Sequence, residues 1–249
     1  MFSDTHCHIY KEYYEDIEKV IFNAKNAGIN KMINNGCDTK TNIEVLNTIK
    51  TYDEVYGAIG IHPEFVDNYN LEDLEFIEKN IMQDKVIAVG EIGLDYHYTK
   101  ENKEKQIDLF HKQLELAEKY SKPVVIHSRE ATDDVLRILK QYKLKGVIHS
   151  FSGSLETAKE YIKLGYLIGI NGVVTFKNCK LRDILTNISL DNIILETDAP
   201  YLTPDPFRGT KNEPAKIQVI AEYVANLYNV SLEELSKITN DNINRVFDI

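Results

Sequence analysis

The sequence predicts an α/β protein of the (β/α)8 TIM barrel class, with residues 1–249 forming a single domain. Three observations support this prediction: short β-rich runs alternate with amphipathic helical stretches, eight such runs recur about every 20 to 35 residues, and histidines gather where the runs end. This alternation favours parallel strands joined by right-handed crossovers, and eight units in 249 residues favour closure into a barrel. The alternative is an open, doubly wound sheet.

The candidate strands start with the extended N-terminus and with KMINNGC at residues 31–37. Six further runs begin at residues 55, 86, 123, 146, 166 and 192, and they read VYGAIGIH, VIAVGEIG, PVVIHS, GVIHSF, YLIGINGVV and NIILETDAP. Apolar runs rich in valine and isoleucine are typical of parallel strands that are buried on both faces. We therefore expect these runs to form the inner wall of the barrel.

The segments between the strands carry helical periodicity. In the first of them, apolar residues at i, i+3 and i+4 predict one buried face, and Gly28 is placed to end the helix; these residues are Ile17, Val20, Ile21, Ala24 and Ala27. After the fifth strand we expect Ser128 to cap a helix whose first turn holds Glu130 and Asp133. The buried side of that helix would be Val135, Leu136, Ile138 and Leu139.

The overall charge restricts the class of partner. A formal net charge of −10, from 29 basic and 39 acidic side chains, argues against a protein that coats nucleic acid with a basic surface. It leaves room for a phosphate substrate whose charge is met by metal ions inside one pocket.

Composition also suggests where the protein works. No apolar run reaches the roughly 18 residues needed to cross a bilayer, and the N-terminus lacks a secretory pattern, so we expect a cytoplasmic protein without membrane contact. Three cysteines without CxxC spacing, Cys7, Cys37 and Cys179, indicate reduced thiols that act as small core residues.

Five of the seven histidines fall at the carboxyl end of a predicted strand: His6, His8, His62, His127 and His149. Two carboxylates join them, because Glu91 follows the fourth strand and Asp198 ends the eighth. In a barrel these strand ends share one rim, on which barrel enzymes build their active sites. A single histidine at a strand end is commonly just hydrogen-bonded, but the group together predicts a functional site.

The spacing of His6 and His8 places both imidazoles on the same side of an extended strand, with Cys7 on the other side. Asp4 shares their side and would either orient an imidazole or serve as an ordinary carboxylate at the strand start. Imidazoles with carboxylates and no thiolate suit Zn²⁺, Mn²⁺ or Fe²⁺, and more carboxylate or water ligands would allow Mg²⁺. Glu91 is the candidate to bridge two such ions.

Six stretches together resemble one known family. In chain order they are DTHCH at 4–8, GIHP at 60–63, GEIGLDY at 90–96, VIHSREA at 125–131, HSFSGS at 149–154 and ETDAPYLTPDPFRGTKNEP at 196–214. The chain resembles, over essentially its whole length, the TatD family of metal-dependent deoxyribonucleases within the amidohydrolase-like barrels. Any one stretch is a weak signal, but six in the same order are specific.

The resemblance implies a role for each matching residue. One metal would be held by His6 and His8 with Glu91 and Asp198, and Glu91 would reach a second metal held by His127 and His149. Asp198 and Glu91 would be the catalytic residues, with Asp198 helping to form a metal-bound hydroxide. Three further residues match positions near the substrate phosphate: His62, Arg129 and Arg208. The alternatives are a structural role for His62, an ordinary helix charge at Arg129 and a loop network around Arg208.

The resemblance therefore implies a hydrolase that cleaves phosphodiester bonds of DNA, from the 3′ end of single strands, with two divalent ions that are Mg, Mn or Zn. One alternative is an amide or ester hydrolase of the amidohydrolase type, including deacylation of aminoacyl-tRNA. The run VIAVGEIG has no lysine to serve as the carboxylated bridge of many such enzymes, which counts against this alternative. A third hypothesis for the function is a non-catalytic, metal-stabilised scaffold.

Overall fold

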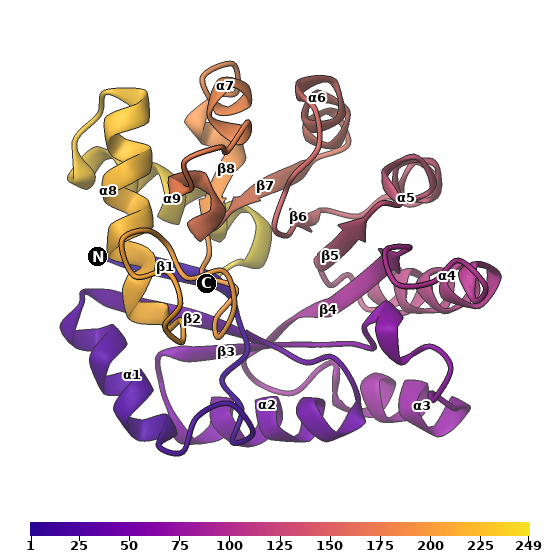
Figure 1. Cartoon of the computed structure of the whole chain (residues 1–249). Coiled ribbons are helices and arrows are strands. Elements are labelled where there is room, and N and C mark those ends of the chain that lie inside the picture. Colours follow the sequence, from indigo (N-terminus) through magenta and orange to yellow (C-terminus); the bar gives the residue numbers. More distant parts are fainter.

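A ring of eight parallel strands, ordered β1 to β8 as in the chain, forms the centre of the molecule (Figure 1). The computed structural model describes all residues, 1–249. The strands are β1 (Phe2–Cys7), β2 (Ile29–Asn35), β3 (Val55–Ile59), β4 (Val86–Asp95), β5 (Val124–Arg129), β6 (Gly146–Ile148), β7 (Tyr166–Ile170) and β8 (Ile193–Leu195). The predicted (β/α)8 barrel is confirmed, and the open sheet is wrong.

The barrel closes between its first and last strands by a short seam. Cys7 and Ala199 form a single parallel bridge. The amide of His8 donates to the Ala199 carbonyl at 2.7 Å, and the amide of Asp198 donates to the His6 carbonyl at 2.9 Å. Closure is therefore concentrated at the carboxyl ends of β1 and β8, where the histidine pair lies.

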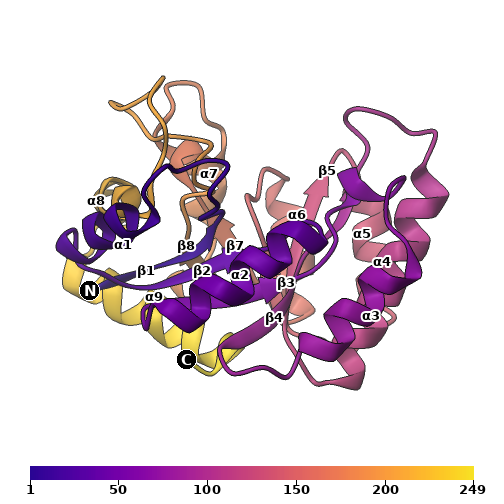
Figure 2. The same ribbon diagram turned by 90° about the horizontal axis from the view of Figure 1, so that it is seen from below.

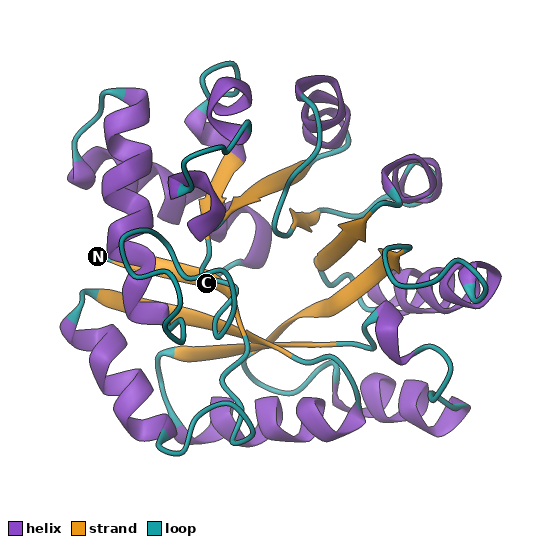
Figure 3. Cartoon of the chain, viewed as in Figure 1, coloured by secondary structure: helices purple, strands orange, loops and turns teal.

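Helices surround the strand ring on the outside, as the purple ribbons of Figure 3 show. They are α1 (Ile17–Asn26), α2 (Thr39–Thr51), α3 (Leu71–Asn80), α4 (Lys103–Lys119), α5 (Thr132–Leu139), α6 (Leu155–Lys163), α7 (Leu181–Leu185), α8 (Ile217–Tyr228) and α9 (Leu232–Phe247). Short 3₁₀ turns are η1 (Pro63–Phe65), η2 (Gly172–Thr175), η3 (Leu190–Asn192) and η4 (Pro214–Lys216). None of the helices combines the length and the hydropathy that a membrane span requires.

The first helix forms as its periodicity predicts, and the fifth begins differently. In α1, Val20, Ile21 and Ala24 are buried, and Gly28 takes a φ of +78° just beyond the helix. The predicted cap by Ser128 is wrong. Pairing with β4 extends β5 through Ser128 to Arg129, so α5 starts only at Thr132 and has no side-chain cap.

The interior has two apolar clusters. The larger one fills the space between the strands and the surrounding helices. The smaller one lies inside the barrel and includes Ile33, Val125 and Leu167, with Val246 and Phe247 of α9 packed against them. Figure 1 shows α9, in yellow, passing behind the strands, and Figure 2 shows the same helix from below. This helix therefore covers the end of the barrel opposite the histidines.

The cysteines are only partly what the sequence indicated. All three are free thiols, as expected. Cys7 is buried in the core, whereas Cys37 and Cys179 are only partly buried. Cys37 lies in the wall of the pocket described next, so it is not a plain core residue.

Candidate metal centre

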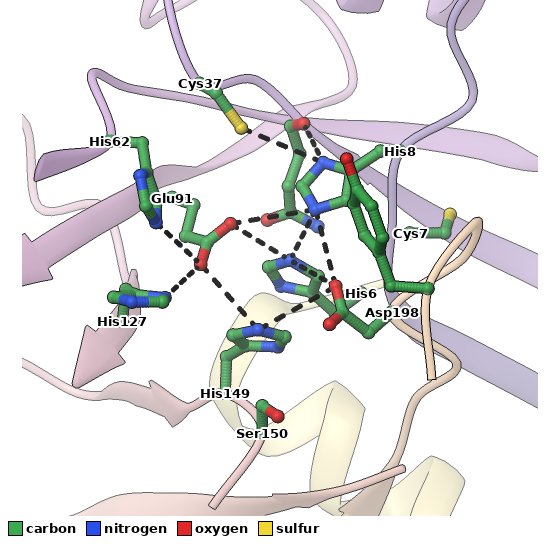
Figure 4. Close-up of polar contacts among 12 residues, drawn as sticks. His6, Cys7, His8, Cys37, His62, Glu91, His127, His149, Ser150 and Asp198 are labelled. Atoms are coloured by element: carbon green, nitrogen blue, oxygen red, sulfur yellow. Dashed lines mark hydrogen bonds and ion pairs between the residues drawn. The ribbon is translucent and has the colours of Figure 1, made fainter. Parts of the chain in front are cut away.

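Glu91 is the centre of the polar cluster at the carboxyl ends of the strands (Figure 4). Its Oε2 lies 3.3 Å from His6 Nε2 and 3.7 Å from His8 Nε2. Its Oε1 lies 2.7 Å from His127 Nδ1 and 3.7 Å from His149 Nε2. Oε2 thus faces His6 and His8, whereas Oε1 faces His127 and His149. Glu91 belongs to β4 itself because that strand continues to Asp95.

Asp198 faces both imidazole pairs from the end of β8. Its Oδ1 lies 3.5 Å from His8 Nε2 and 3.9 Å from both His6 Nε2 and His149 Nε2. The structure therefore gathers all six predicted ligands, which lie in β1, β4 and β5 or shortly after β1, β6 and β8, into one contact network.

The three residues predicted near a substrate phosphate lie in different surroundings. His62 is buried, with Nε2 3.6 Å from Glu91 Oε1, so it adjoins the ligand cluster itself. Arg129 is exposed in the pocket wall, with its guanidinium 5.2 Å from the Tyr98 ring centre. Arg208 instead lies over the Phe176 ring at 3.8 Å, and the lining of this pocket does not include it.

Two acidic residues that the sequence analysis did not single out contact the histidines. Asp95 Oδ2 lies 2.9 Å from His127 Nε2, and Glu196 Oε1 lies 3.0 Å from His149 Nδ1. Alternation along the chain was the available signal, since Asp95 shares the strand face of Glu91 and Glu196 is two residues before Asp198.

Asp4 does not orient an imidazole. One of its oxygens accepts from the backbone amides of His6 at 3.2 Å and Thr197 at 2.9 Å, and the other accepts from the Thr197 hydroxyl. It therefore joins β1 to the segment after β8, and burial raises its pKa to about 8 against the effect of these bonds. Of the two alternatives for Asp4, these contacts support the ordinary carboxylate at the strand start, because both of its oxygens bond to groups of the seam.

Backbone and carboxylate acceptors fix the far nitrogens of two histidines. His8 Nδ1 lies 3.0 Å from the Asn35 carbonyl and 3.1 Å from the Tyr10 hydroxyl, so Nε2 is left to face Asp198. His127 presents Nδ1 to Glu91 while Nε2 bonds Asp95. A partner on the far nitrogen sets the tautomer and the ring orientation of a metal-binding histidine.

Buried side-chain amides hold the strand ends that carry these residues. Each pairs with the amide and carbonyl of one residue near the site. Asn42 of α2 clamps Gly60, Gln113 of α4 clamps Ile61, Gln106 of α4 clamps Asp95, and Asn34 of β2 clamps Ile9. The loops of the site are thus tied to the surrounding helices and strands by two-point hydrogen bonds.

The histidines and carboxylates of the cluster shift one another's pKa values. Burial alone would raise the pKa of Glu91, but His6 and His149 hold it well below its usual value. Burial disfavours protonation of His149, yet the carboxylates of Glu196 and Glu91 outweigh it and raise its pKa to about 9. The same balance with its two carboxylate partners raises the pKa of His127 to about 9. The buried carboxylates therefore favour positive charge within the cluster, which a bound cation would also supply.

The cluster forms the floor of a pocket of about 550 Å³. Beside the cluster, the lining has aromatic, basic and acidic side chains: Tyr10, Tyr13, Tyr98, Tyr201, Lys40, Arg129, Glu12, Asp38 and Glu64. Tyr201 is half exposed, and its hydroxyl donates to that of Tyr13 at 2.8 Å. The aromatic rings offer contact area for flat, apolar parts of a ligand, and Lys40 and Arg129 can bind an anionic group.

The donor set fits a metal ion. Ligand atoms lie within 4.8 Å of one another in several groups of three, including His6, His8 and Asp198, and also His62, Glu91 and His127. Neutral imidazole and carboxylate are ligands of Zn²⁺, Mn²⁺ and Fe²⁺. The fold and the donor set together define a metal-binding (β/α)8 barrel with its chemistry at the carboxyl ends of the strands.

Comparison with known proteins narrows this class. The family model described as TatD related DNase matches residues 3–248. The uncharacterized metal-dependent hydrolase YabD of Bacillus subtilis (strain 168) is 40% identical over the full length of both chains. Its counterpart YcfH of Escherichia coli K12 is 36% identical over 99% of this chain and 95% of the other.

A solved structure agrees with the sequence relatives. The crystal structure of YjjV, a TatD homologue from E. coli K12, superposes with a TM-score of 0.95 at 32% identity, covering 100% of this chain and 98% of the other. The chain belongs to the TatD family of metal-dependent hydrolases.

Proposed function

We propose that this hydrolase cleaves phosphodiester bonds in DNA and removes nucleotides from the 3′ end of single strands at a site with two divalent cations. One observation carries the proposal: the Glu91 carboxylate lies between two imidazole groups, with one oxygen toward each. Such a carboxylate can bridge two ions, and paired ions suit phosphoryl displacement because they stabilise both the attacking and the leaving oxygen. The family description, TatD related DNase, supports the same substrate.

We propose the ligand groups that the family resemblance implies, and the distances from Glu91 and Asp198 support them. His6, His8 and Asp198 would hold one cation and His127 with His149 the other, while Glu91 would reach both. Mg²⁺, Mn²⁺ and Zn²⁺ are each compatible with this donor set. Bound there, the cations would supply the positive charge that makes water acidic and neutralises the phosphate.

The side chains of the protein account for the remaining requirements. Asp198 has an oxygen near both imidazole pairs, so it is placed to accept a proton from the attacking water. The guanidinium of Arg129 in the wall can bind a phosphate oxygen, a geometry that suits the planar fork of arginine. Tyr201 and Tyr98 offer exposed ring faces on which a base of a single strand can stack.

The test compares DNA strands that differ only in label and end chemistry. Protein stripped with a chelator is reloaded with Mg²⁺, Mn²⁺ or Zn²⁺ and incubated with a single strand labelled at its 5′ end. We expect a ladder that shortens from the 3′ end, loss of the ladder when the 3′-terminal linkages are phosphorothioates, and loss with the chelator. A parallel panel of cyclic amides, N-acyl amino acids and aminoacyl-tRNA tests the amide or ester hydrolase alternative.

Metal content is measured on the same samples, so that a lack of activity can be separated from a lack of bound metal. If the protein carries metal and shortens none of the strands, the proposal is wrong. Turnover of a member of the amide and ester panel, together with intact DNA, would establish the alternative.

A further inference from the structure

Glu196 lies beside His6 and His149, two of the predicted metal ligands, and ligand atoms of the three residues lie within 4.8 Å of one another. Glu196, His6 and His149 are 0%, 0% and 5% exposed. Neither His6 Nδ1 nor Glu196 Oε2 has a hydrogen-bond partner, and His149 Nδ1 has only its ion-pair contact with Glu196 Oε1 at 3.0 Å. Buried polar atoms are normally paired, so these three atoms call for an explanation.

The Nδ1 nitrogens of His6 and His149 face the same way. His6 Nε2 and His149 Nε2 both point to Glu91 and Asp198, at distances between 3.3 and 3.9 Å. The two rings are stacked, with centroids 3.6 Å apart and planes 20° apart. Their Nδ1 edges therefore lie together on the far side, where Glu196 Oε1 is 3.0 Å from His149 Nδ1.

The geometry of these three residues could also hold a cation, but the protonation chemistry of imidazole disfavours one there if the Nε2 atoms serve the metal centre. A neutral imidazole carries one N–H, and the nitrogen that binds a metal must be the unprotonated one. If the Nε2 atoms serve the metal centre, both Nδ1 atoms carry hydrogen and act as donors. The carboxylate of Glu196 accepts only, so it complements two donors.

The surrounding backbone shapes the place of this carboxylate. The amide of Ser150 donates to Glu196 Oε1 at 2.6 Å and fixes that oxygen. Gly169 of β7 leaves the room for the other, because a Cβ there would lie 2.5 Å from Glu196 Oε2. The Ser150 amide thus fixes Oε1 of Glu196, and the absence of a side chain at Gly169 leaves room for Oε2.

We propose that Glu196 is a positioning residue that holds His6 and His149 together in the Nδ1-protonated tautomer. Resting on the proposed two-cation function, the inference gives Glu196 a role at both cations, because His6 belongs to one ligand group and His149 to the other. Asp95 offers a contrast, since its carboxylate contacts His127 alone among the predicted ligands.

The test reads the tautomers directly. Protein with ¹⁵N-labelled histidine is studied by NMR in the metal-free state, at alkaline pH where the imidazoles are neutral, and the signals are assigned with His6→Gln and His149→Gln. Wild type should show hydrogen on Nδ1 of both rings. Glu196→Gln should shift both rings toward a tautomer mixture, whereas Asp95→Asn should change His127 and leave the other two unchanged.

Zn²⁺ titration against a chromophoric chelator supplies the second readout. Loss of an acceptor bonded to a metal-binding histidine typically weakens binding about 10- to 100-fold. We expect Glu196→Gln to weaken both binding steps to that extent and Asp95→Asn to weaken one. Gly169→Ala provides a variant that keeps the charge, since its methyl group displaces the carboxylate, and it should reproduce the tautomer change if Glu196→Gln fails to fold.

The outcomes separate this inference from the proposed function. Wild-type tautomers in Glu196→Gln, or unchanged Zn²⁺ affinity, would overturn the role of Glu196 whatever the enzyme cleaves. Shifted tautomers in a protein that leaves DNA intact would sustain it and refute the deoxyribonuclease.

Discussion

Asp198 combines an unusual backbone conformation with a central position in the site. Its φ is +55°, a region that residues other than glycine seldom occupy, though aspartate does so more often than most. The Asp198 amide is bonded to the His6 carbonyl, and its carboxylate faces both imidazole pairs. Backbone strain of this kind is kept where the surroundings enforce it, and here it directs the carboxylate at the floor of the pocket.

We expect Asp198→Asn to lower turnover by about 10²- to 10⁴-fold, because it replaces a proton acceptor by an amide of the same size. Turnover is measured at saturating metal, with metal content and the urea unfolding curve recorded alongside. The fold should be retained, since the change removes no core volume. Turnover equal to that of the wild type would refute the proton-accepting role.

Arg129→Ala should raise KM for a DNA strand about 10- to 100-fold, since hydrogen bonds to charged groups contribute about 1.5–3 kcal/mol. Steady-state kinetics with strands of one length check this value. Arg137→Ala is the matched control, because Arg137 is an exposed arginine of α5 that pairs with Asp134 outside the pocket. A similar KM change in both variants would show a general effect of charge in place of a contact at Arg129.

At the scale of the helices and strands, buried side-chain amides fix the positions of the segments around the site. Gln113 of α4 is fully buried; its Oε1 accepts from the Ile61 amide at 2.7 Å, and its Nε2 donates to the Ile61 carbonyl at 2.9 Å. Ile61 directly precedes His62, so a helix on the outside of the barrel sets the course of a loop that reaches the metal centre. A buried amide with both partners in place supports the local conformation, and one that lost them would be costly.

Gln113→Leu should lower the free energy of unfolding by about 1–3 kcal/mol, because it keeps the approximate size of the side chain but leaves the Ile61 amide and carbonyl unpaired. Urea denaturation measures the change. Gln141→Leu, at an exposed position after α5, serves as control and should stay within about 0.5 kcal/mol of wild type. Equal stability of the two variants would show that the clamp contributes nothing.

In the whole molecule, the residues that stabilise the fold and the residues of the candidate site lie at opposite ends of the barrel. One end carries the polar cluster and the pocket, and the other is filled by apolar side chains, including Phe247 of α9, that pack against the inner cluster. Barrel enzymes commonly divide these tasks between the two ends of the strands. A change at the closed end should therefore alter stability without altering the ligand geometry.

Phe247→Ala should cost about 3–5 kcal/mol of unfolding free energy, as is usual when a buried aromatic ring leaves a cavity. The folded fraction should keep the metal affinity of the wild type, which a Zn²⁺ titration below the unfolding transition can measure. Phe22→Ala is the control, because that ring is 60% exposed. A large loss of metal affinity in Phe247→Ala would contradict the separation.

Much of the fold could be predicted because it depends on local sequence patterns. Each strand is an apolar run, the buried face of α1 follows its spacing, and alternation of strand and helix leaves few topologies. The meeting of the six predicted ligands at one rim could be predicted because each lies in or near the carboxyl end of a strand, whereas their role as metal ligands stays a prediction. The cap at Ser128 failed for the opposite reason: pairing with β4 extends β5, and a strand partner outweighs a local capping preference.

The sequence alone predicts the order of the strands and the rim at which the histidines lie, because strand and helix patterns are local. It also predicts the shared side of His6 and His8, because these residues are two apart in one strand. Which carboxylate faces which nitrogen depends on how the strands lie side by side. Asp4 meets Thr197 because β1 and β8 join, and Glu196 meets His149 because β6 and β8 both flank β7. Contacts between residues so far apart in sequence arise from tertiary packing, and no local pattern encodes them.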